Sequence, residues 1–362
     1  MLKEKVSANQ FFVLLYLSLL STVFMYLSSP HIKIAQTDTI LRPLVFAFVS
    51  FLVSIPVFLV LKKHIELRDA HKYIPSTKPL RVMAFVYAIV YLINILKAAA
   101  RFDLFASSEL FPNSDMTVFL VSIIVACVCL SSLGLGALAR GAGIFAFLVC
   151  ASTGFVMLSL ISEVDFLNFT PVLENGVEDF FEEGLIFAVQ ATEIGTIIMF
   201  LPEIKGNIKK SFTLWTIFSA LTFSLVFFFV VGSLGSFADT QLFPTYTSVT
   251  LASFGLIERI DALETAIWIL CVVEKISFYF LVTVKALKYA FGKTDKRKIS
   301  IITGVTVSVL IAFVSYNIER FSFLSADVLS IVLFVLALIV LPVVIYFYIK
   351  RVKPCDKIPE NI

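Results

Sequence analysis

The sequence predicts an all-α, polytopic membrane protein with ten transmembrane helices. Only 15% of its 362 residues are charged, whereas a soluble domain carries charge at roughly a quarter of its positions. Hydrophobic residues make up 59% of the chain, and a helix needs about 20 apolar residues to cross the hydrocarbon layer. Ten such runs begin near residues 10, 39, 80, 116, 139, 182, 211, 259, 299 and 325. Because nothing is left for a sizeable soluble domain, residues 1–362 are expected to form a single transmembrane domain.

Lysine and arginine residues are unevenly distributed between alternate loops. One set of loops carries most of them, such as Lys62 and Lys63 after the second run and Lys209 and Lys210 after the sixth. Because basic loops stay on the cytoplasmic side of a membrane, both termini are expected there. An even number of helices agrees with this arrangement. The basic clusters therefore require no nucleic acid as a partner.

No cluster of residues indicates an enzyme, a cofactor or a metal site. Four of the five cysteines lie inside apolar runs, a pattern that favours neither a disulfide framework nor a metal centre. The three histidines are scattered, without the spacing of metal ligands. Residues 134–143 are rich in glycine, but they connect two apolar runs and no P-loop lysine follows. We therefore expect no enzymatic activity and no cofactor.

Two apolar runs are longer than the others, at about residues 80–105 and 259–290. Long apolar helices are expected to tilt in the membrane. Each is the third run in a group of five, and because five is odd, the two cross the membrane in opposite directions. This pattern predicts two inverted five-helix repeats, residues 8–163 and 180–350, a plan on which many secondary transporters are built.

In such folds the first helix of each repeat is broken near the middle of the membrane, where free backbone groups bind substrate. Hydroxyl groups compete with helical hydrogen bonds, and proline ends a helix. Both first helices carry residues that favour a break: Ser21, Thr22, Ser28, Ser29 and Pro30 in residues 19–30, and Gln190, Thr192, Glu193, Gly195 and Thr196 in residues 187–202. For the first helix, the alternative is an unbroken helix whose hydroxyls bond to its own carbonyls.

Ionisable residues inside apolar runs are the strongest indication of a functional interior. A charge at the bilayer centre costs on the order of 2.5–3.5 kcal/mol, so such a residue usually faces protein or a cavity. Glu193 is expected near the midplane. With 3.6 residues per turn, one stripe of the eighth run contains Asp261, Glu264, Trp268, Cys271 and Lys275, while Arg259 points almost the opposite way. We expect this stripe to face the interior of the bundle.

The charges of the eighth run also have other interpretations. In one interpretation, a solvated extension of the helix with local ion pairs contains Glu258, Arg259, Asp261 and Glu264. In a second interpretation, Glu274 and Lys275 form structural ion pairs with a neighbouring helix. In a third, Lys275 stands in for a bound cation or carries a transported proton.

Two further charged features lie near the predicted outer surface. Lys97 and Arg101, one turn apart in the third run, either extend towards the interface or hold a ligand carboxylate or an acidic loop. Residues 163–184 form a loop with seven acidic residues and no basic one. This loop is either a solvated segment with a short amphipathic helix or an outer vestibule that attracts cations or docks a partner.

Several short motifs resemble those of bacterial endospore germination permeases. Before and inside the eighth run, the family pattern is a Pro-Thr pair, a Glu-Arg pair, a following acid and a tryptophan. The corresponding residues are Pro244, Thr245, Glu258, Arg259, Asp261 and Trp268. Other matches are residues 170–176, residues 200–205, Arg140, Gln10 and Asp38. The resemblance covers nearly the whole chain in length, number of runs and order of motifs.

The resemblance implies membership of the amino acid/polyamine/organocation transporter superfamily, with a LeuT-like fold of ten helices in two inverted sets of five. It also implies the B subunit of a nutrient germinant receptor in the spore inner membrane, acting with an A subunit and a lipoprotein C subunit. The chain departs from the family where its first helix usually has glycines, because Ser21 and Val23 occupy those positions. Bare main-chain amides are therefore less open to a substrate carboxylate here. Thr196 lies where some members carry an acid.

The expected function is that of a receptor-type permease which binds a small, amino acid-like nutrient halfway across the membrane. The residues expected to bind it are Ser21, Thr22, Thr192, Glu193, Gly195, Thr196 and Trp268. Those expected to form a charge network are Lys97, Arg101, Arg259, Asp261, Glu264, Glu274 and Lys275. Two other functions remain open. One is a secondary transporter of amino acids or amines, coupled to protons through Glu193 or Lys275, and the other is a structural subunit that binds no ligand and anchors partners.

Overall fold

The computed structural model describes residues 5–24, 34–35, 37–69, 77–112, 117–172, 176–252, 260–292, 295–316, 324 and 327–352. Its first elements are β1 (Val6–Ser7), α1 (Ala8–Phe24), η1 (Thr37–Ile40), α2 (Arg42–Val53), α3 (Ile55–Asp69), α4 (Lys78–Phe105), η2 (Ala106–Leu110), α5 (Thr117–Ser132), α6 (Leu135–Leu160), η3 (Ile161–Glu163) and η4 (Phe166–Phe169). The remaining elements are α7 (Gly176–Ala188), η5 (Thr192–Gly195), α8 (Thr196–Phe200), β2 (Ile204–Lys205), α9 (Ile208–Leu234), η6 (Gly235–Thr240), α10 (Pro244–Thr250), α11 (Ile260–Phe291), α12 (Lys296–Tyr316), α13 (Asp327–Val335), η8 (Leu336–Val340) and α14 (Leu341–Arg351).

Within the described residues, six helices are long and apolar enough to cross a membrane, and there are eight candidate spans if each of two bent pairs counts as one. The six are α4, α6, α9, α11, α12 and the continuous run from α13 to α14. The bent pairs are α2 with α3, at 40°, and α7 with α8, at 47°. α1 and α5 are shorter apolar helices. Each of the ten expected runs begins within six residues of a helix start, and the chain is an all-α, multi-pass membrane protein as predicted.

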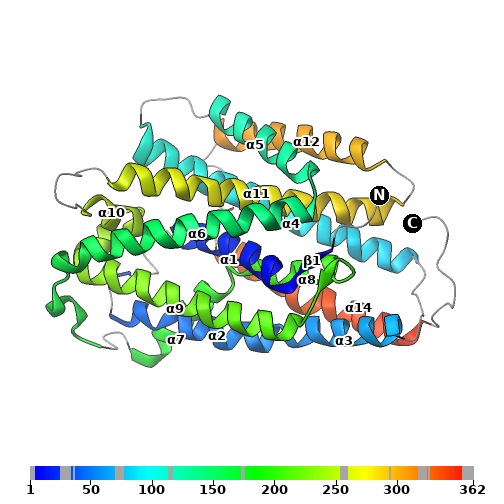
Figure 1. Ribbon diagram of the computed structural model, residues 1–362, viewed down its shortest axis with the longest axis horizontal. Helices are drawn as coiled ribbons and strands as arrows, with labels where there is room; N and C mark the ends of the chain where they lie inside the picture. Colours follow the sequence, from blue (N-terminus) through cyan, green and yellow to red (C-terminus); the bar gives the residue numbers. More distant parts are fainter. Residues whose placement is uncertain are drawn as a thin grey trace.

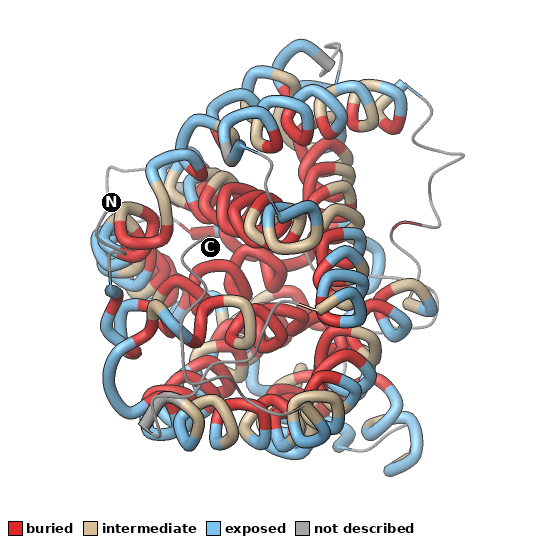
Figure 2. Tube along the Cα trace, turned by 90° about the vertical axis from the view of Figure 1, so that its right-hand side faces the viewer, coloured by how far each residue is buried: buried red, intermediate tan, exposed pale blue. Residues whose placement is uncertain are grey.

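The long helices lie side by side along the longest axis of the molecule (Figure 1). Seen along that axis, buried residues gather in the middle of the bundle and exposed residues on its rim (Figure 2). Many exposed side chains are large and apolar, such as Val118, Phe147 and Leu221. Lipid tails are as apolar as leucine, so a rim of this kind suits a bilayer.

α1 lies inside the bundle and packs against α6, α9 and α11. Fourteen of its 17 residues are buried, which requires a helix that is apolar on every side. The polar side chains that it does carry, such as Ser18 and Thr22, are therefore turned towards other helices.

The two longest helices, α4 with 28 residues and α11 with 32, pack against each other. α11 also contacts α1, α5 and α6. The stripe predicted to face the interior of the bundle is buried at Glu264, Trp268, Cys271 and Lys275, and half-buried at Asp261. That prediction is confirmed for the residues of the stripe that follow Asp261 in the sequence.

The predicted break in the sixth run is present between α7 and α8. After Val189 the hydrogen bonds no longer run four residues back: Gln190 N–H donates to Phe187 O, and Ala191 N–H to Ala188 O. The chain then forms the 3-10 turn η5 before α8 begins. The break places the backbone and side chains of η5 in the interior of the bundle, where Thr192, Glu193, Ile194 and Gly195 are all buried.

The first helix is regular as far as Phe24. Ser21 Oγ donates to Ser18 O at 2.8 Å, which is the bonding of a hydroxyl to its own helix that the unbroken alternative predicts. Ser28, Ser29 and Pro30 lie outside the described residues. A break at Ser21 or Thr22 is therefore wrong, and one beyond Phe24 stays a prediction.

One acidic residue of the loop expected in solvent is buried instead. Glu183 lies in α7 and forms an ion pair with Arg42 at the start of α2, with both residues buried. Charges removed from water need such a partner. The ion pair joins α2 to α7, whereas Glu178, Asp179 and Glu182 of the same stretch are exposed.

Two short strands, which the sequence does not predict, connect distant parts of the chain. β1 and β2 pair in parallel, with Val6 opposite Ile204 and Ser7 opposite Lys205. Next to them, Lys285 Nζ of α11 contacts Glu203 Oε1 at 2.7 Å. We call β1, β2 and this ion pair the terminal clasp, because they hold the residues before α1 against the residues after α8.

Candidate functional site

A buried carboxylate lies at the centre of the broken helix. Glu193, in η5, has no exposed surface. Its Oε1 accepts hydrogen bonds from Ser18 Oγ of α1 at 3.1 Å and from Tyr279 Oη of α11 at 2.8 Å. Lys275 Nζ, also on α11, completes the set at 2.8 Å. One oxygen atom thus joins three elements that are far apart in the sequence.

The ammonium group of Lys275 uses all of its donors. Besides Glu193, it donates to the carbonyl oxygen of Ser18 at 3.0 Å and to Thr22 Oγ1 at 2.5 Å. A lysine has three donors and no acceptor, so no hydrogen of this group is left for another molecule. A carbonyl, a hydroxyl and a carboxylate are also the oxygen ligands that a hard metal cation prefers.

A second layer of polar groups supports η5 from α4 and α11. Tyr91 Oη donates to the carbonyl oxygen of Thr192 at 3.0 Å. The hydroxyl of Thr192 lies 3.3 Å from Asn94 Oδ1 and 3.1 Å from Tyr279 Oη. Buried polar groups that all find partners make a region rigid. The position of the break is therefore defined by side chains on both long helices.

A small cavity lies beside this network. Its walls come from α1, α4, the turn after α7, and α11. We call it the charged cavity, and its lining residues are Thr22, Asn94, Lys97, Ala98, Arg101, Gln190, Lys275 and Tyr279. Three of these residues are cationic and none is acidic. Lys97 Nζ donates to Ser330 Oγ of α13 at 2.5 Å, which brings a fifth segment to its edge.

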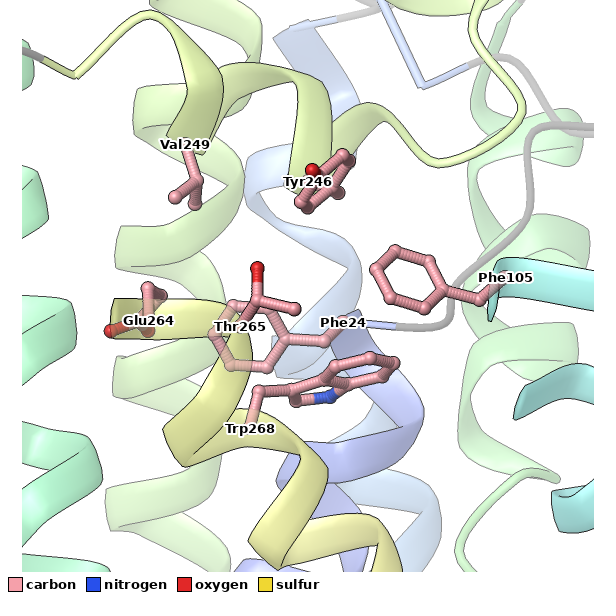
Figure 3. A pocket seen from close by; sticks show the side chains of 7 residues that line it. All are labelled: Phe24, Phe105, Tyr246, Val249, Glu264, Thr265 and Trp268. Carbon is pink, nitrogen blue, oxygen red and sulfur yellow. The ribbon is translucent and has the colours of Figure 1, made fainter. Parts of the chain in front are cut away.

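A second small cavity is lined mainly by aromatic rings (Figure 3). Thr265 extends from α11 towards Tyr246 and Val249 of α10, whereas the Trp268 ring extends towards Phe105. The rings of Phe105 and Trp268 lie 4.6 Å apart, at 75° to each other. We call this the aromatic cavity, and its remaining lining residues are Phe24 and Glu264. Glu264 Oε1 accepts a hydrogen bond from Thr153 Oγ1 of α6 at 2.8 Å.

The family of the chain follows from its match to known proteins. A family model described as spore germination protein, or spore permease, matches residues 5–321. The chain belongs to the spore germination protein family. Members of this kind are membrane permeases by name, and the polar interior of the present member is compatible with a non-enzymatic permease.

Two relatives place this spore germination protein in sequence and in fold. It is 23% identical over 300 residues to YfkT of Bacillus subtilis (strain 168), which carries the name of a spore germination protein. That match covers 80% of this chain and 81% of YfkT. In structure it is similar to a Na⁺-coupled sialic acid symporter in a substrate-bound, outward-open state, with a TM-score of 0.59 and 14% identity. The match covers 92% of this chain and 79% of the symporter. The fold is therefore LeuT-like.

The structure of this family member brings together some of the residues predicted to bind a ligand. Thr22 lines the charged cavity, and Thr192 and Glu193 lie directly behind its wall. The hydroxyls of Ser21 and Thr196 are used inside their own segments, because Thr196 Oγ1 donates to Glu193 O at 2.6 Å. Gly195 faces α4, where a Cβ atom would lie 2.8 Å from Tyr91 Oη.

The remaining predicted residues are divided between several places. Trp268 and Glu264 line the aromatic cavity and not the charged one. Glu274 is buried, and among the described residues neither of its carboxylate oxygens has a hydrogen-bond partner. Asp261 is half-buried at the start of α11, and Arg259 lies outside the described residues.

Three residues of the site were not predicted. Ser18, Tyr91 and Tyr279 hold Glu193 and Thr192 in place. A helical repeat of 3.6 residues puts Tyr279 one turn after Lys275 and Ser18 one turn before Thr22. That spacing is the signal available in the sequence. It is weak, because hydroxyl side chains one turn apart are common in apolar helices.

Proposed function

We propose that the chain is the membrane subunit of a nutrient germinant receptor and that it binds a small, amino acid-like nutrient in the charged cavity. The observation that carries this proposal is the cavity itself, which lies where the helix formed by α7 and α8 is interrupted. Buried charged residues are costly inside a membrane and usually mark a pathway or a ligand site. Binding sites of small molecules are typically concave, with a few converging polar groups.

The architecture that we propose has ten helices in two inverted repeats of five, residues 8–163 and 180–350. The likeness to a LeuT-fold symporter supports it. α7 and α8, which open the second repeat, form a broken helix. α4 and α11 are the third helices of their groups and pack against each other across the charged cavity. Transporters with this plan bind substrate near the interrupted helices.

We propose that the nutrient signals by shifting an equilibrium between two conformations. A ligand can do so only if it binds one conformation more tightly than the other. Lys275 would then act as a cation that the protein carries itself, because its ammonium group joins α1 to η5 and α11 through Ser18, Thr22 and Glu193. The affinity for a nutrient that binds beside this ammonium group would therefore depend on the relative positions of α1, η5 and α11.

The proposed receptor lies in the spore inner membrane with both termini on the cytoplasmic side, and it works with an A subunit and a lipoprotein C subunit. Family membership supports this arrangement. Purification of the three subunits from spore membranes through a tag on this chain tests it. Recovery of this chain alone from intact membranes contradicts it.

Replacement of Glu193 by glutamine tests the nutrient site. The amide has nearly the same shape but cannot balance the charge of Lys275, so the wall of the charged cavity is expected to rearrange. Spores in which Glu193→Gln is the sole copy of this subunit should need at least about tenfold more nutrient for half-maximal germination, since charged hydrogen bonds contribute about 1.5–3 kcal/mol. The loss of optical density with increasing nutrient concentration measures the response.

The matched control is Glu178→Gln, which changes an exposed carboxylate on α7 of the same broken helix. This variant should respond as the unchanged protein does, and both variants should reach the membrane in equal amounts. An unchanged dose response of the Glu193→Gln spores removes Glu193 from the nutrient site.

A second candidate function is active, proton-coupled transport of amino acids or amines. The buried pair of Lys275 and Glu193 favours it, because a proton can move between an ammonium and a carboxylate 2.8 Å apart. Uptake of labelled substrate into proteoliposomes, driven by a proton gradient, distinguishes the two functions. A receptor that does not transport gives no accumulation above empty vesicles.

A further inference from the structure

One buried carboxyl group belongs to neither cavity and has no part in the proposed nutrient site. Glu274, in the middle of α11, is 3% exposed and lines neither the charged nor the aromatic cavity. We propose that Glu274 is a proton-binding site, which holds a proton in the present conformation and releases it when the contact between α5 and α11 opens to water. This inference goes beyond the proposed function, because its ligand is a proton and its site is a separate one.

The first reason is that the carboxyl group has no hydrogen-bond partner. Among the described residues, none donates to Glu274 Oε1 or Oε2 or accepts from them. An ionised carboxylate buried in this way is far less stable than the neutral acid, so such a group takes up a proton. The proton is therefore the ligand that this environment favours.

The second reason concerns the cation next to Glu274 in the sequence. Lys275 follows it directly, but successive side chains of a helix point about 100° apart. The ammonium group of Lys275 gives its three donors to Ser18, Thr22 and Glu193. Its positive charge is already paired with the carboxylate of Glu193 at 2.8 Å. A negative charge on Glu274 would be a second anion beside one cation.

The other ionisable groups of the region do not change this balance. Those that interact electrostatically with Glu274 are Lys275 and Cys271 of α11, Glu193 of η5 and Cys127 of α5. Ionisable groups on the other helices packed against α11 lie near different partners or in solvent: Tyr16 of α1, Lys97 and Arg101 of α4, Cys150 of α6, Tyr246 of α10, and Arg297 and Lys298 of α12. Glu274 thus faces one ion pair and two thiols in the described part of the chain.

The third reason is the cover of this face of α11. α5 is a short apolar helix that packs against α11 and α12 (Figure 1). Its buried residues form one stripe, Leu120, Ile124, Cys127 and Ser131, and the opposite side is exposed. Cys127 Sγ donates to the carbonyl oxygen of Val273 at 3.5 Å, and a thiol is a weak donor. α5 is therefore the side from which water is expected to reach Glu274.

The missing hydrogen bonds make the contact between α5 and α11 sensitive to the proton. In the closed contact a neutral carboxyl group leaves its donor and its acceptors unused, and water supplies these partners in an open contact. An ionised carboxylate gains far more from water. Loss of the proton should therefore shift the balance towards the open contact, so that a rise in pH acts like removal of a ligand.

Infrared spectroscopy of the purified full-length protein in lipid nanodiscs tests whether Glu274 holds a proton. A protonated carboxyl group gives a carbonyl band that is separate from the bands of carboxylates. Subtraction of the Glu274→Gln spectrum from that of the unchanged protein should leave this band at neutral pH. The matched control is Glu178→Gln, which replaces an exposed acid and should not remove the band. A carboxylate band in its place overturns the proposal, and indicates a metal cation or water beside Glu274.

The pH dependence of unfolding in detergent measures the same proton independently. An unfolded chain releases a glutamate proton above about pH 4.3, whereas the folded protein is expected to keep it. Between about pH 5 and 7, the unfolding constant of the unchanged protein should therefore rise about tenfold per pH unit relative to that of Glu274→Gln. Glu274→Leu is a second variant without an ionisable group and should behave as Glu274→Gln does. Parallel pH profiles for the unchanged protein and both variants overturn the proposal.

Cys127 reports whether the contact between α5 and α11 opens. The residue has no exposed surface, so a maleimide reaches its thiol only when α5 moves. Labelling of the Cys127 peptide, measured by mass spectrometry, should be faster in the unchanged protein than in Glu274→Gln, and the ratio of the two rates should rise with pH. Comparison at a single pH cancels the pH dependence of the thiol reaction. A ratio that does not change with pH overturns the link between the proton and this contact. These measurements use no nutrient, so their outcome does not depend on the charged cavity.

Discussion

At the scale of single residues, the ammonium group of Lys275 determines how three elements fit together. It extends from α11 to oxygens of α1 and η5, with only 6% of the residue exposed. Moving a charge out of water costs several kcal/mol, and an ion pair recovers this cost only with good geometry and further hydrogen bonds. Lys275 lies 2.8 Å from Glu193 Oε1, and Ser18 and Tyr279 donate to the same oxygen, whereas Glu193 Oε2 has no hydrogen-bond partner among the described residues.

Removal of the lysine is expected to destabilise the protein strongly. Lys275→Met leaves Glu193 buried without its cation, and breaking one side of a buried pair costs about 3–5 kcal/mol. The double variant Lys275→Met with Glu193→Gln removes both charges and should lose less. Unfolding of the purified protein in detergent measures the free energy of each variant.

The corresponding control is Lys63→Met, which removes the partner of Glu66 in a more exposed ion pair on α3. Surface pairs contribute about 0–1 kcal/mol, so a small change is expected. A double variant that is no more stable than the single Lys275→Met variant shows that the two charges do not depend on each other.

The sequence shows that Glu193 and Lys275 are special, because a charge inside an apolar run is conspicuous. It does not show that they meet. Their pairing depends on how α1, η5 and α11 are rotated against one another, and a single sequence carries no record of those rotations. Ser18 and Tyr279 escaped prediction for a related reason, since only their position beside Glu193 distinguishes them.

At the scale of elements, the break between α7 and α8 is packed against α4 and the π-turn η8. Gly195 lies at the closest point, where an added Cβ would be 2.8 Å from Tyr91 Oη and 3.0 Å from Ala337 O. The carbonyl belongs to the backbone and cannot move aside easily. Because residue 195 has no side chain, η5 can lie this close to Tyr91 of α4 and Ala337 of η8.

Gly195→Ala should therefore be destabilising even though alanine favours helices. Inserting a methyl group into a packed interior costs about 1–3 kcal/mol. The variant should also weaken the hydrogen bond from Tyr91 to Thr192, because the tyrosine has to turn away. Thermal unfolding in detergent measures the loss.

Gly154→Ala is the control for this change. Gly154 lies in α6 with open space where its Cβ would be, so the variant should be neutral or gain up to about 1 kcal/mol of helix propensity. Equal losses for both glycines contradict the close packing of η5.

Helix starts are predictable from this sequence because a membrane helix is marked by length and hydropathy alone. The break in the sixth run was also predicted, since polar residues and a glycine interrupt it. The bend between α2 and α3 and the strands β1 and β2 were not. Two residues are too few to form a pattern, and a pairing of residues 6 and 204 depends on the completed fold.

At the scale of the whole molecule, the terminal clasp connects the segment before α1 with the segment after α8. Val6 N–H donates to Glu203 O at 2.9 Å, next to the pairing of β1 with β2. Lys285 Nζ lies 2.7 Å from Glu203 Oε1 and 4.0 Å from the centre of the Phe200 ring. A cation over an aromatic face adds to the attraction.

Weakening the clasp should change dynamics more than stability. Glu203→Gln removes a partly exposed charge pair, which contributes about 0–1 kcal/mol. We expect faster hydrogen–deuterium exchange in residues 5–12 and 200–210, with little change in α9 and α12. Mass spectrometry of peptides from the purified protein measures it.

Glu66→Gln, in the exposed pair on α3, is the control and should leave these peptides unchanged. Exchange that is equally fast in the Glu203→Gln variant and in the unchanged protein shows that the ion pair does not hold the clasp closed.

Composition alone identifies the molecule as a multi-pass membrane protein, and its motifs indicate the family. The position of the cavities does not follow from either. The charged cavity needs α4 beside α11, and the aromatic cavity needs α10 folded over α11. Trp268 and Lys275 share one stripe of α11, but they are seven residues and about two helical turns apart and line different cavities.

The parallel pairing of β1 with β2 has a mechanical consequence. The strand that follows the short helix α8 is bonded to the strand that precedes α1. A displacement of β2 is transmitted to β1 through the backbone hydrogen bonds that join the two strands. A movement of α8 would thereby be transmitted to the residues that precede α1.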